Sequence, residues 1–217
     1  MDDLTILYYT ANIFEPSGER IRQHLQAEAR EIPIISVSQK PMIFGGNIWV
    51  GEIGISKYNI YKQIYTGVQA VKTKYVACCE DDVLYNYDHF KYRPKQGIFA
   101  YDCNMWFAEP EEFWRRPQIH ERSGMFGCIV ETQTLYDEMK KRFDKYPQPD
   151  PKNYDWGEPQ SPVEYFMGDY PLIVFCHDTS TKKKRLLEKH KRNSLPEDHI
   201  QSVELYGDIQ TLWSVYI

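Results

Sequence analysis

Apolar, β-rich segments alternate with amphipathic helical patterns over the first half of this chain. Leu4 to Thr10 and Pro33 to Gln39 have the composition of strands, and a helical stripe of apolar residues lies between them, after Pro16-Ser17-Gly18. This alternation is typical of βαβ units built around a mainly parallel sheet. We therefore predict an α/β fold with helices flanking a central sheet. At 217 residues the chain fits one domain that buries a substantial core.

A second helical pattern leads into a strand that ends in three acids. Ser56 is the predicted N-cap of this helix, and Tyr75 to Cys79 is the strand. Glu80-Asp81-Asp82 follows the strand directly. Ligands of open parallel sheets bind beyond the carboxyl ends of the strands, so the triplet lies at the expected ligand edge. A solvated acidic turn is the competing interpretation. The apolar stripe of the preceding helix consists of Ile60, Ile64, Val68 and Val71.

The acidic triplet has the chemistry of a divalent-cation site. Mg2+ and Mn2+ favour oxygen ligands and commonly bind one or two carboxylates together with substrate phosphates. Alternate residues of a strand share a face, so Glu80 and Asp82 are expected to point together, with Asp81 turned away. We predict that one of this pair binds the metal, directly or through water, and that the other holds the sugar of a bound nucleotide.

A histidine near the end of the chain is a candidate partner for these acids. Pro171 to His177 reads as a last central strand, and imidazole commonly joins carboxylates around a catalytic divalent metal. His177 is therefore a candidate metal ligand, on condition that it lies close to Asp82. A structural or merely exposed histidine is the alternative.

The first strand ends in Thr10-Ala11-Asn12, where backbone and small polar side chains are able to contact a base or ribose. An ordinary turn, with Asn12 bonded to its own backbone, explains the same residues. Beyond the acids, strands are predicted at Gly97 to Phe107 and Met125 to Val130, and Thr132 is predicted to cap a helix. At the end of the first of these strands, Asp102 and Asn104 are candidates for binding donor or acceptor hydroxyls.

Two later segments have unusual compositions. Tyr146 to Pro162 contains five prolines, which fits a lid, an acceptor loop or a rigid connector. Thr181 to Arg192 carries seven Lys or Arg against one Glu, a density that is able to neutralise phosphates and that also fits a solvated helix face. The basic residues that open this segment are Lys182, Lys183, Lys184 and Arg185.

Composition and missing motifs exclude several classes of protein. No stretch approaches the roughly 20 apolar residues that span a bilayer, and Met1-Asp2-Asp3 does not begin a signal peptide, so a cytoplasmic location is expected. The five cysteines lack a C-x-x-C pair and are expected to be small core residues. A net charge of -5 argues against a protein coated in nucleic acid, but it permits one local basic face. The absence of G-x-x-x-x-G-K-[ST] and G-x-G-x-x-G disfavours P-loop enzymes and dinucleotide oxidoreductases.

Motifs over most of the chain together carry a family resemblance. They are Leu4 to Asn12, Pro33 to Pro41 with Phe44-Gly45, Glu80-Asp81-Asp82-Val83-Leu84-Tyr85 with His89-Phe90, Ser123-Gly124, and Glu164 through His177. These motifs resemble small bacterial and phage glycosyltransferases of the GT-A fold. The acidic motif of that group usually reads E-H-D-V-L-Y, so Asp81 is a departure, whereas Glu80 and Asp82 keep their places. The resemblance implies a nucleotide-sugar donor, most often a UDP-sugar, and Mn2+ or Mg2+ held by the acidic motif.

Transfer of a sugar to a hydroxyl makes two chemical demands. The metal neutralises the leaving diphosphate, and an inverting reaction needs a carboxylate to take the acceptor proton. By its place in the resemblance Glu164 is the candidate base, with Asp169 in reserve. The alternative for Glu164 is that it simply starts a helix. A retaining enzyme needs no dedicated base.

Resemblance to phage enzymes, and to the glucosyltransferase that makes base J, favours a hydroxymethylated pyrimidine in DNA as acceptor. The alternatives are a polysaccharide or small-molecule hydroxyl, and a catalytically silent nucleotide-sugar or nucleic-acid binding module. A nucleotidyltransferase with a related sheet is disfavoured because its glycine- and arginine-rich phosphate loop is missing near the N-terminus. Within one domain we expect a nucleotide-sugar-binding half in residues 1–90, an acceptor and catalytic half in 91–192, and a C-terminal tail in 193–217.

Overall fold

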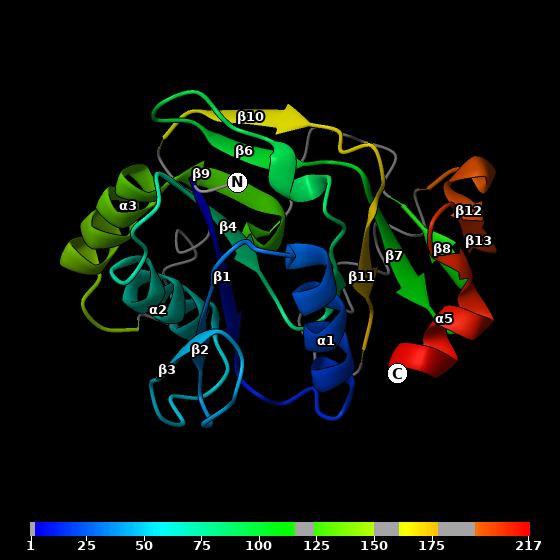
Figure 1. Ribbon diagram of the computed structural model, residues 1–217, viewed down its shortest axis with the longest axis horizontal. Helices are drawn as coiled ribbons and strands as arrows, with labels where there is room; N and C mark the ends of the chain where they lie inside the picture. The colour runs from blue at the N-terminus through cyan, green and yellow to red at the C-terminus, as the bar shows by residue number, and fades with distance from the viewer. Residues whose placement is uncertain (1–2, 116–123, 150–160, 178–193) are drawn as a thin grey trace.

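The computed structural model describes residues 3–115, 124–149, 161–177 and 194–217. Its main sheet has seven strands in the order β10-β6-β9-β4-β1-β2-β3, and all of them except β9 run in the same direction (Figure 1). The predicted α/β class with a mainly parallel central sheet is therefore confirmed. The strands are β1 (Leu4–Thr10), β2 (Ile34–Ser38), β3 (Gly46–Trp49), β4 (Tyr75–Cys79), β6 (Phe99–Asp102), β9 (Cys128–Glu131) and β10 (Val163–Phe166).

A second, mixed sheet of five strands lies beside the first. The segment predicted as one strand from Gly97 to Phe107 is broken after Asp102, and the chain then enters this second sheet. The strand predicted from Pro171 to His177 is shorter and also belongs to the second sheet, so its assignment to the central sheet was wrong. The strands, in sheet order, are β12 (His199–Ile200), β8 (Glu112–Trp114), β7 (Met105–Glu109), β11 (Leu172–Phe175) and β5 (Val83–Leu84).

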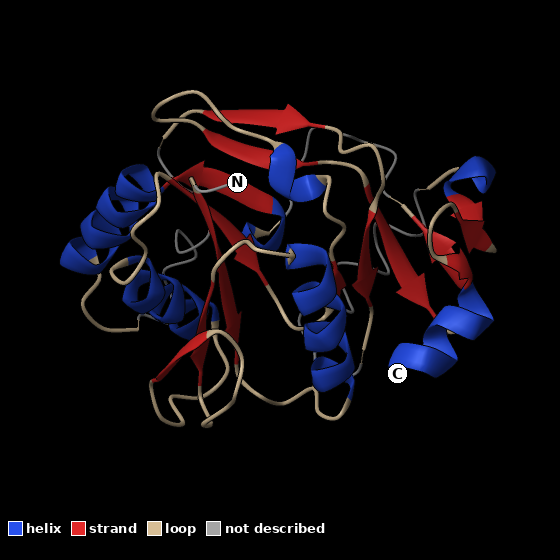
Figure 2. Ribbon diagram, in the orientation of Figure 1, coloured by secondary structure: helices blue, strands red, loops and turns tan. Residues whose placement is uncertain are grey.

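Helices cover both faces of the main sheet (Figure 2). Helix α1 (Ser17–Ala29) packs on one face, and α2 (Lys57–Val68) and α3 (Thr132–Lys145) pack on the other. Side chains of a strand alternate between faces, so Ile6 in β1 joins the core under α1, whereas Leu7 joins the core under α2. Burial on both faces explains why these strands are almost continuously apolar.

The N-cap residue was predicted correctly from the sequence for α2 but not for α3. Ser56 caps α2 as expected, because its hydroxyl accepts a hydrogen bond from the Asn59 N–H. The prediction that Thr132 caps α3 was wrong: Glu131 occupies that position, and Thr132 is the first helical residue. The Thr132 hydroxyl instead donates to the Thr73 carbonyl at 2.9 Å, which ties the start of α3 to the turn before β4.

Residues from 194 onward form part of the fold, although we expected a tail there. A hairpin of β13 (Ser202–Val203) and β14 (Gly207–Asp208) leads into α5 (Ile209–Tyr216), which the Asp208 side chain caps. Arg20 of α1 donates to the carbonyls of Tyr216 and Ile217, so the last helix is attached to the first. Three of the five cysteines are buried and all five are free thiols, as expected for core residues. The described part of the chain contains no helix long and apolar enough to cross a membrane.

His24 also links α1 to the C-terminal helix. Its Nε2 lies 2.8 Å from the Tyr85 carbonyl and must donate a proton there, so Nδ1 accepts from the Tyr216 hydroxyl at 3.1 Å. Burial lowers the pKa of His24 below its ordinary value of 6.5. The folded protein therefore favours the neutral ring, since protonation of Nδ1 would remove the contact with Tyr216.

The protein is expected to lose stability as the pH falls below 6.5, in part through His24. Because the pKa of His24 is lowered in the folded protein, the unfolded chain binds the proton at a higher pH. The free energy of unfolding therefore falls as the pH drops from 6.5 toward the folded-state pKa. Above this window the contribution is constant. Denaturant unfolding of wild type and His24→Gln at about pH 7.5 and about pH 5 measures the effect, and the variant should lose less stability on acidification. Equal losses in the two proteins would contradict this role.

Candidate functional site

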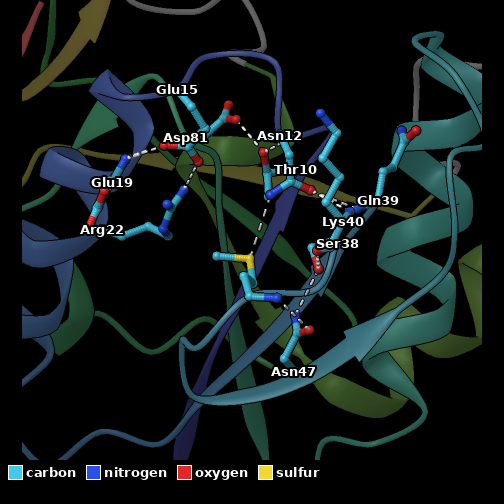
Figure 3. Close-up of polar contacts among 11 residues, drawn as sticks. Thr10, Asn12, Glu15, Glu19, Arg22, Ser38, Gln39, Lys40, Asn47 and Asp81 are labelled. Atoms are coloured by element: carbon cyan, nitrogen blue, oxygen red, sulfur yellow. Dashed lines mark hydrogen bonds and ion pairs between the residues drawn. The ribbon is translucent and has the colours of Figure 1, made fainter.

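The carboxyl ends of β1, β2 and β4 meet at one edge of the main sheet. Thr10 pairs with Ser38 across β1 and β2, and Tyr8 pairs with Cys79 across β1 and β4. The acidic triplet therefore emerges beside the end of β1, as predicted. The Thr10 hydroxyl donates to the Asp81 carboxylate, which fixes the middle acid of the triplet (Figure 3).

The structure brings Asp82 and His177 together. Asp82 Oδ2 lies 3.5 Å from His177 Nε2, and the Phe175 N–H donates to the Asp82 carbonyl at 2.8 Å. That bond accompanies the antiparallel pairing of β11 with β5, which carries His177 back to the acids. The His177 ring stacks on Phe14, with ring centroids 3.8 Å apart. The side chains of Asp82 and His177 are 5% and 12% exposed, so the pair is held in a defined place.

The Asp82 and His177 pair fits two ligands of one divalent ion. With metal–ligand bonds of about 2.1 Å, adjacent octahedral ligands lie about 3 Å apart, close to the observed 3.5 Å. Within the described residues, no three His, Cys, Asp or Glu side chains converge as a metal cluster. Two protein ligands would leave the remaining positions to water and phosphate oxygens, which is the coordination that Mg2+ prefers.

Glu80 does not share a direction with Asp82, contrary to our expectation. Its carboxylate accepts from the Tyr9 hydroxyl at 3.0 Å, and Tyr9 belongs to the core under α2. Burial, reinforced by the Glu80 charge, raises the pKa of Tyr9, so this hydroxyl stays protonated and donates. The two-residue alternation failed because β4 ends at Cys79 and the chain turns at Asp81 and Asp82.

The side chains of Thr10 and Asn12, predicted to bind the donor, make contacts within the protein. Asn12 has a positive φ of 56°, and its N–H donates to the Thr10 hydroxyl at 2.8 Å. Its side-chain oxygen accepts from the backbone N–H groups of Gln39 and Lys40 at 2.9 and 2.8 Å (Figure 3). Asn12 therefore joins the ends of β1 and β2. Ala11 lies half-buried between them.

Asp102, predicted to grip a ligand hydroxyl, is fully buried and bonded within the protein. One oxygen lies 3.0 Å from His89 Nδ1, and the other accepts from the N–H groups of Asn104 and Gly168 at 2.9 and 3.3 Å. The Asn104 side chain donates to the Gly168 carbonyl at 2.8 Å. Both residues thus attach the strand ends at β6 and β7 to the segment before β11. Sequence reasoning missed this role because the partner His89 carries no spacing signal.

The two candidate bases lie away from the Asp82 and His177 pair. Glu164 is in β10, an edge strand separated from β4 by β6 and β9, so the suggestion that it starts a helix was wrong. Its carboxylate accepts from the Tyr92 hydroxyl at 3.0 Å. Asp169 is exposed and precedes β11, whereas His177 follows it. Four strand residues span about 13 Å, so Asp169 and His177 lie at opposite ends of that strand.

The predicted phosphate-binding segment, Lys182, Lys183, Lys184 and Arg185, lies outside the described residues, as does most of the proline-rich stretch 146–162.

The structure adds a group that sequence reasoning missed. Glu15 Oε1 pairs with Arg22 at 2.6 Å, and both lie near the Tyr8 hydroxyl. Glu15 precedes α1, so helical spacing did not indicate that it pairs with Arg22.

The sequence matches no family model and no curated protein sequence. Among solved structures, it is similar to 2-C-methyl-D-erythritol 4-phosphate cytidylyltransferase from Thermus thermophilus, with a TM-score of 0.51 and 11% identity over 86% of this chain and 99% of that one. It is also similar to a glycosyltransferase involved in glycosylation of the major capsid of PBCV-1, with a TM-score of 0.49 and 9% identity over 85% of this chain and 98% of that one.

A third similar structure is the bifunctional IspDF from Campylobacter jejuni, with a TM-score of 0.46 and 9% identity over 77% of this chain. The chain spans half the length of that protein. At 11% identity, the likeness to the cytidylyltransferase shows a shared α/β fold. The fold by itself does not define the chemistry, which has to be argued from the residues of the site.

Proposed function

We propose that this chain is a metal-dependent glycosyltransferase that moves a sugar from a nucleotide-sugar, in first place a UDP-sugar, to a hydroxyl acceptor. The observation that carries the proposal is the 3.5 Å contact between Asp82 and His177, beside Asp81 at the carboxyl edge of the main sheet. Acids at this edge are placed to meet the ligand of an α/β sheet. The motif resemblance supplies the donor class.

Each residue of the site has a definable task in this proposal. Asp82 and His177 would hold Mn2+ or Mg2+, which when bound neutralises the charge of the leaving diphosphate. Thr10 orients Asp81 by donating to its carboxylate, and Phe14 supports His177 by stacking. Because the Asp82 carboxylate and the His177 ring are largely buried, they are held in place before a ligand arrives.

The acceptor proton defines a second part of the proposal. Glu164 remains our candidate base for an inverting reaction, with Asp169 in reserve, and an acceptor that uses Glu164 has to extend toward the β10 edge of the sheet. A retaining reaction needs no such base and fits the same metal pair. Glu164→Gln separates the two, because only an inverting enzyme that uses this base should lose most of its kcat.

The favoured acceptor is a 5-hydroxymethylpyrimidine in DNA, supported by the motif resemblance and the basic composition of residues 181–192. An enzyme that acts on a base inside a duplex has to expose it, at a cost of a few kcal/mol. Phosphate contacts make DNA affinity fall steeply with salt. A flat salt profile of acceptor affinity would therefore argue for a polysaccharide or small-molecule hydroxyl.

Donor hydrolysis tests the function directly. The purified protein is incubated with Mn2+ and a panel of UDP-sugars, with and without DNA that contains 5-hydroxymethylcytosine or 5-hydroxymethyluracil. Turnover stimulated by the modified DNA is the expected result. Slow hydrolysis that ignores DNA would support a saccharide acceptor, whereas no hydrolysis of any donor would favour a silent binding module.

A further inference from the structure

The first turn of α1 contains an anion-binding arrangement that a carboxylate of the protein itself occupies. One oxygen of Glu15 accepts from the Glu19 N–H at 3.0 Å, and the other accepts from the Arg22 guanidinium at 2.6 Å. A helix of 13 residues carries partial positive charge at its N-terminus, which favours negative groups there. Glu15 thus occupies the position that an oxyanion would take.

A buried hydroxyl next to this position lacks an acceptor. Tyr8 is fully buried, and its hydroxyl has no acceptor among the described residues, although the Arg22 guanidinium lies beside it as a donor. Burial raises the pKa of Tyr8, and nearby Asp81 and Glu15 raise it further, so the phenol remains a neutral donor. An unpaired buried polar group is unfavourable, because its lost hydrogen bond to water is not replaced. An incoming oxyanion would give this hydroxyl the acceptor that it lacks.

Glu15 is held in a way that allows its displacement. Its side chain is 37% exposed, whereas that of Arg22 is 13% exposed, so the anion is the accessible member of the pair. Ion pairs with an exposed partner contribute little to stability, because solvent screens the two charges. An anion with several phosphate oxygens is able to bond the N–H, the guanidinium and the phenol at the same time, which Glu15 does not do.

The position adjoins the proposed metal pair on two sides. Phe14, the residue before Glu15, stacks on His177. Asp81, whose charge acts on the Tyr8 hydroxyl, is the residue before Asp82. A phosphate group at the start of α1 would therefore lie next to the ion, and the charge of Asp81 would keep the affinity for an anion without a cation low.

We propose that the Glu19 N–H, the Arg22 guanidinium and the Tyr8 hydroxyl form a subsite for phosphate oxygens of a nucleotide diphosphate, and that Glu15 occupies this subsite until the nucleotide displaces it. The inference rests on the proposed function and deepens it. It makes Glu15 an internal competitor of the donor diphosphate, at a position next to the cation that the donor requires.

Inorganic pyrophosphate is the probe that isolates this subsite. Binding is followed in buffer without divalent cations through the NMR shift of the Glu19 amide, in wild type, Glu15→Gln and Glu19→Gln. Glu15→Gln is expected to tighten binding about three- to fivefold, because the competing charge is lost. Glu19→Gln removes the same charge from the same helix turn but leaves the Glu15 and Arg22 pair, so it should change affinity less. Equal effects of the two variants would overturn the proposal.

Tyr8→Phe provides a second test that does not depend on Glu15. It removes only a hydroxyl that lacks an acceptor, so the protein should fold normally, yet pyrophosphate should bind at least about twofold more weakly in the Glu15→Gln background. Unchanged affinity would exclude the hydroxyl from the subsite. Loss of the Glu15→Gln effect while UDP-sugars are still turned over would refute the subsite alone, whereas tight pyrophosphate binding without any turnover would refute the function alone.

Discussion

Asp82→Asn is expected to lower donor turnover by at least about a hundredfold while the protein remains folded. Asparagine keeps the shape of the side chain but removes the charge that faces His177 at 3.5 Å. The expected loss lies in kcat/KM for the UDP-sugar and in Mn2+ affinity, measured by steady-state kinetics and by metal titration. His177→Gln should weaken Mn2+ affinity in the same assay.

Glu80→Gln is the matched control for Asp82→Asn. It removes an equal charge two residues earlier, from a carboxylate that contacts Tyr9 in the other core. Because Glu80 lies on the α2 side of the sheet, its loss should reduce kcat/KM by less than about tenfold. Unaltered turnover in Asp82→Asn would show that the acidic triplet is not the metal site, and equal losses in both variants would restore the predicted pairing of Glu80 with Asp82.

Asp102→Ala is expected to reduce the free energy of unfolding by about 3 to 5 kcal/mol. The substitution removes a fully buried carboxylate and leaves three donors, one of them buried and two partly buried, without their acceptor. These donors are His89 Nδ1 and the N–H groups of Asn104 and Gly168. His89 is itself 0% exposed, so its Nδ1 has no direct access to solvent when the Asp102 carboxylate is removed.

Denaturant unfolding measures the effect of Asp102→Ala, provided that the dependence of the free energy of unfolding on denaturant concentration is unchanged. Asp169→Ala is the control. Asp169 is exposed, so its replacement should change the free energy of unfolding by less than about 0.5 kcal/mol. A loss below about 1 kcal/mol in Asp102→Ala would contradict the structural role of this residue. If the variant instead unfolds normally and binds donor poorly, the original prediction that Asp102 grips a ligand hydroxyl would be supported.

Much of the fold was predictable because β1, β2 and β4 are buried on both faces. Burial of this kind requires nearly unbroken apolar runs, which the sequence displays directly, and the intervening helix patterns require crossover connections between parallel strands. The prediction was less accurate beyond the acidic triplet. There the chain passes between two sheets, and a short apolar run such as Leu172–Phe175 has the same composition in either of them.

Some residues of the candidate site were also predictable from the sequence, whereas the roles of others were not. Asp82 was predictable because an acid after a buried strand has to emerge at the carboxyl edge of the sheet. The direction of the Glu80 side chain was not predictable, because side chains alternate only while a strand continues. Strand β4 ends at Cys79, one residue before Glu80. Asp102 and Asn12 look like ligand-binding residues in sequence, yet each completes a buried network whose partners are distant along the chain.

The sequence alone thus determined the α/β class, the parallel order of the first strands and the edge at which Asp82 emerges, since these follow from local periodicity and burial. Only the tertiary structure decided that His177 faces Asp82, that Glu164 lies on the far edge strand, and that Glu15 covers Arg22 beside Tyr8. The physical reason is that local periodicity depends on neighbouring residues, whereas these contacts depend on pairing between β5 and β11 and on the packing of α1 against both sheets.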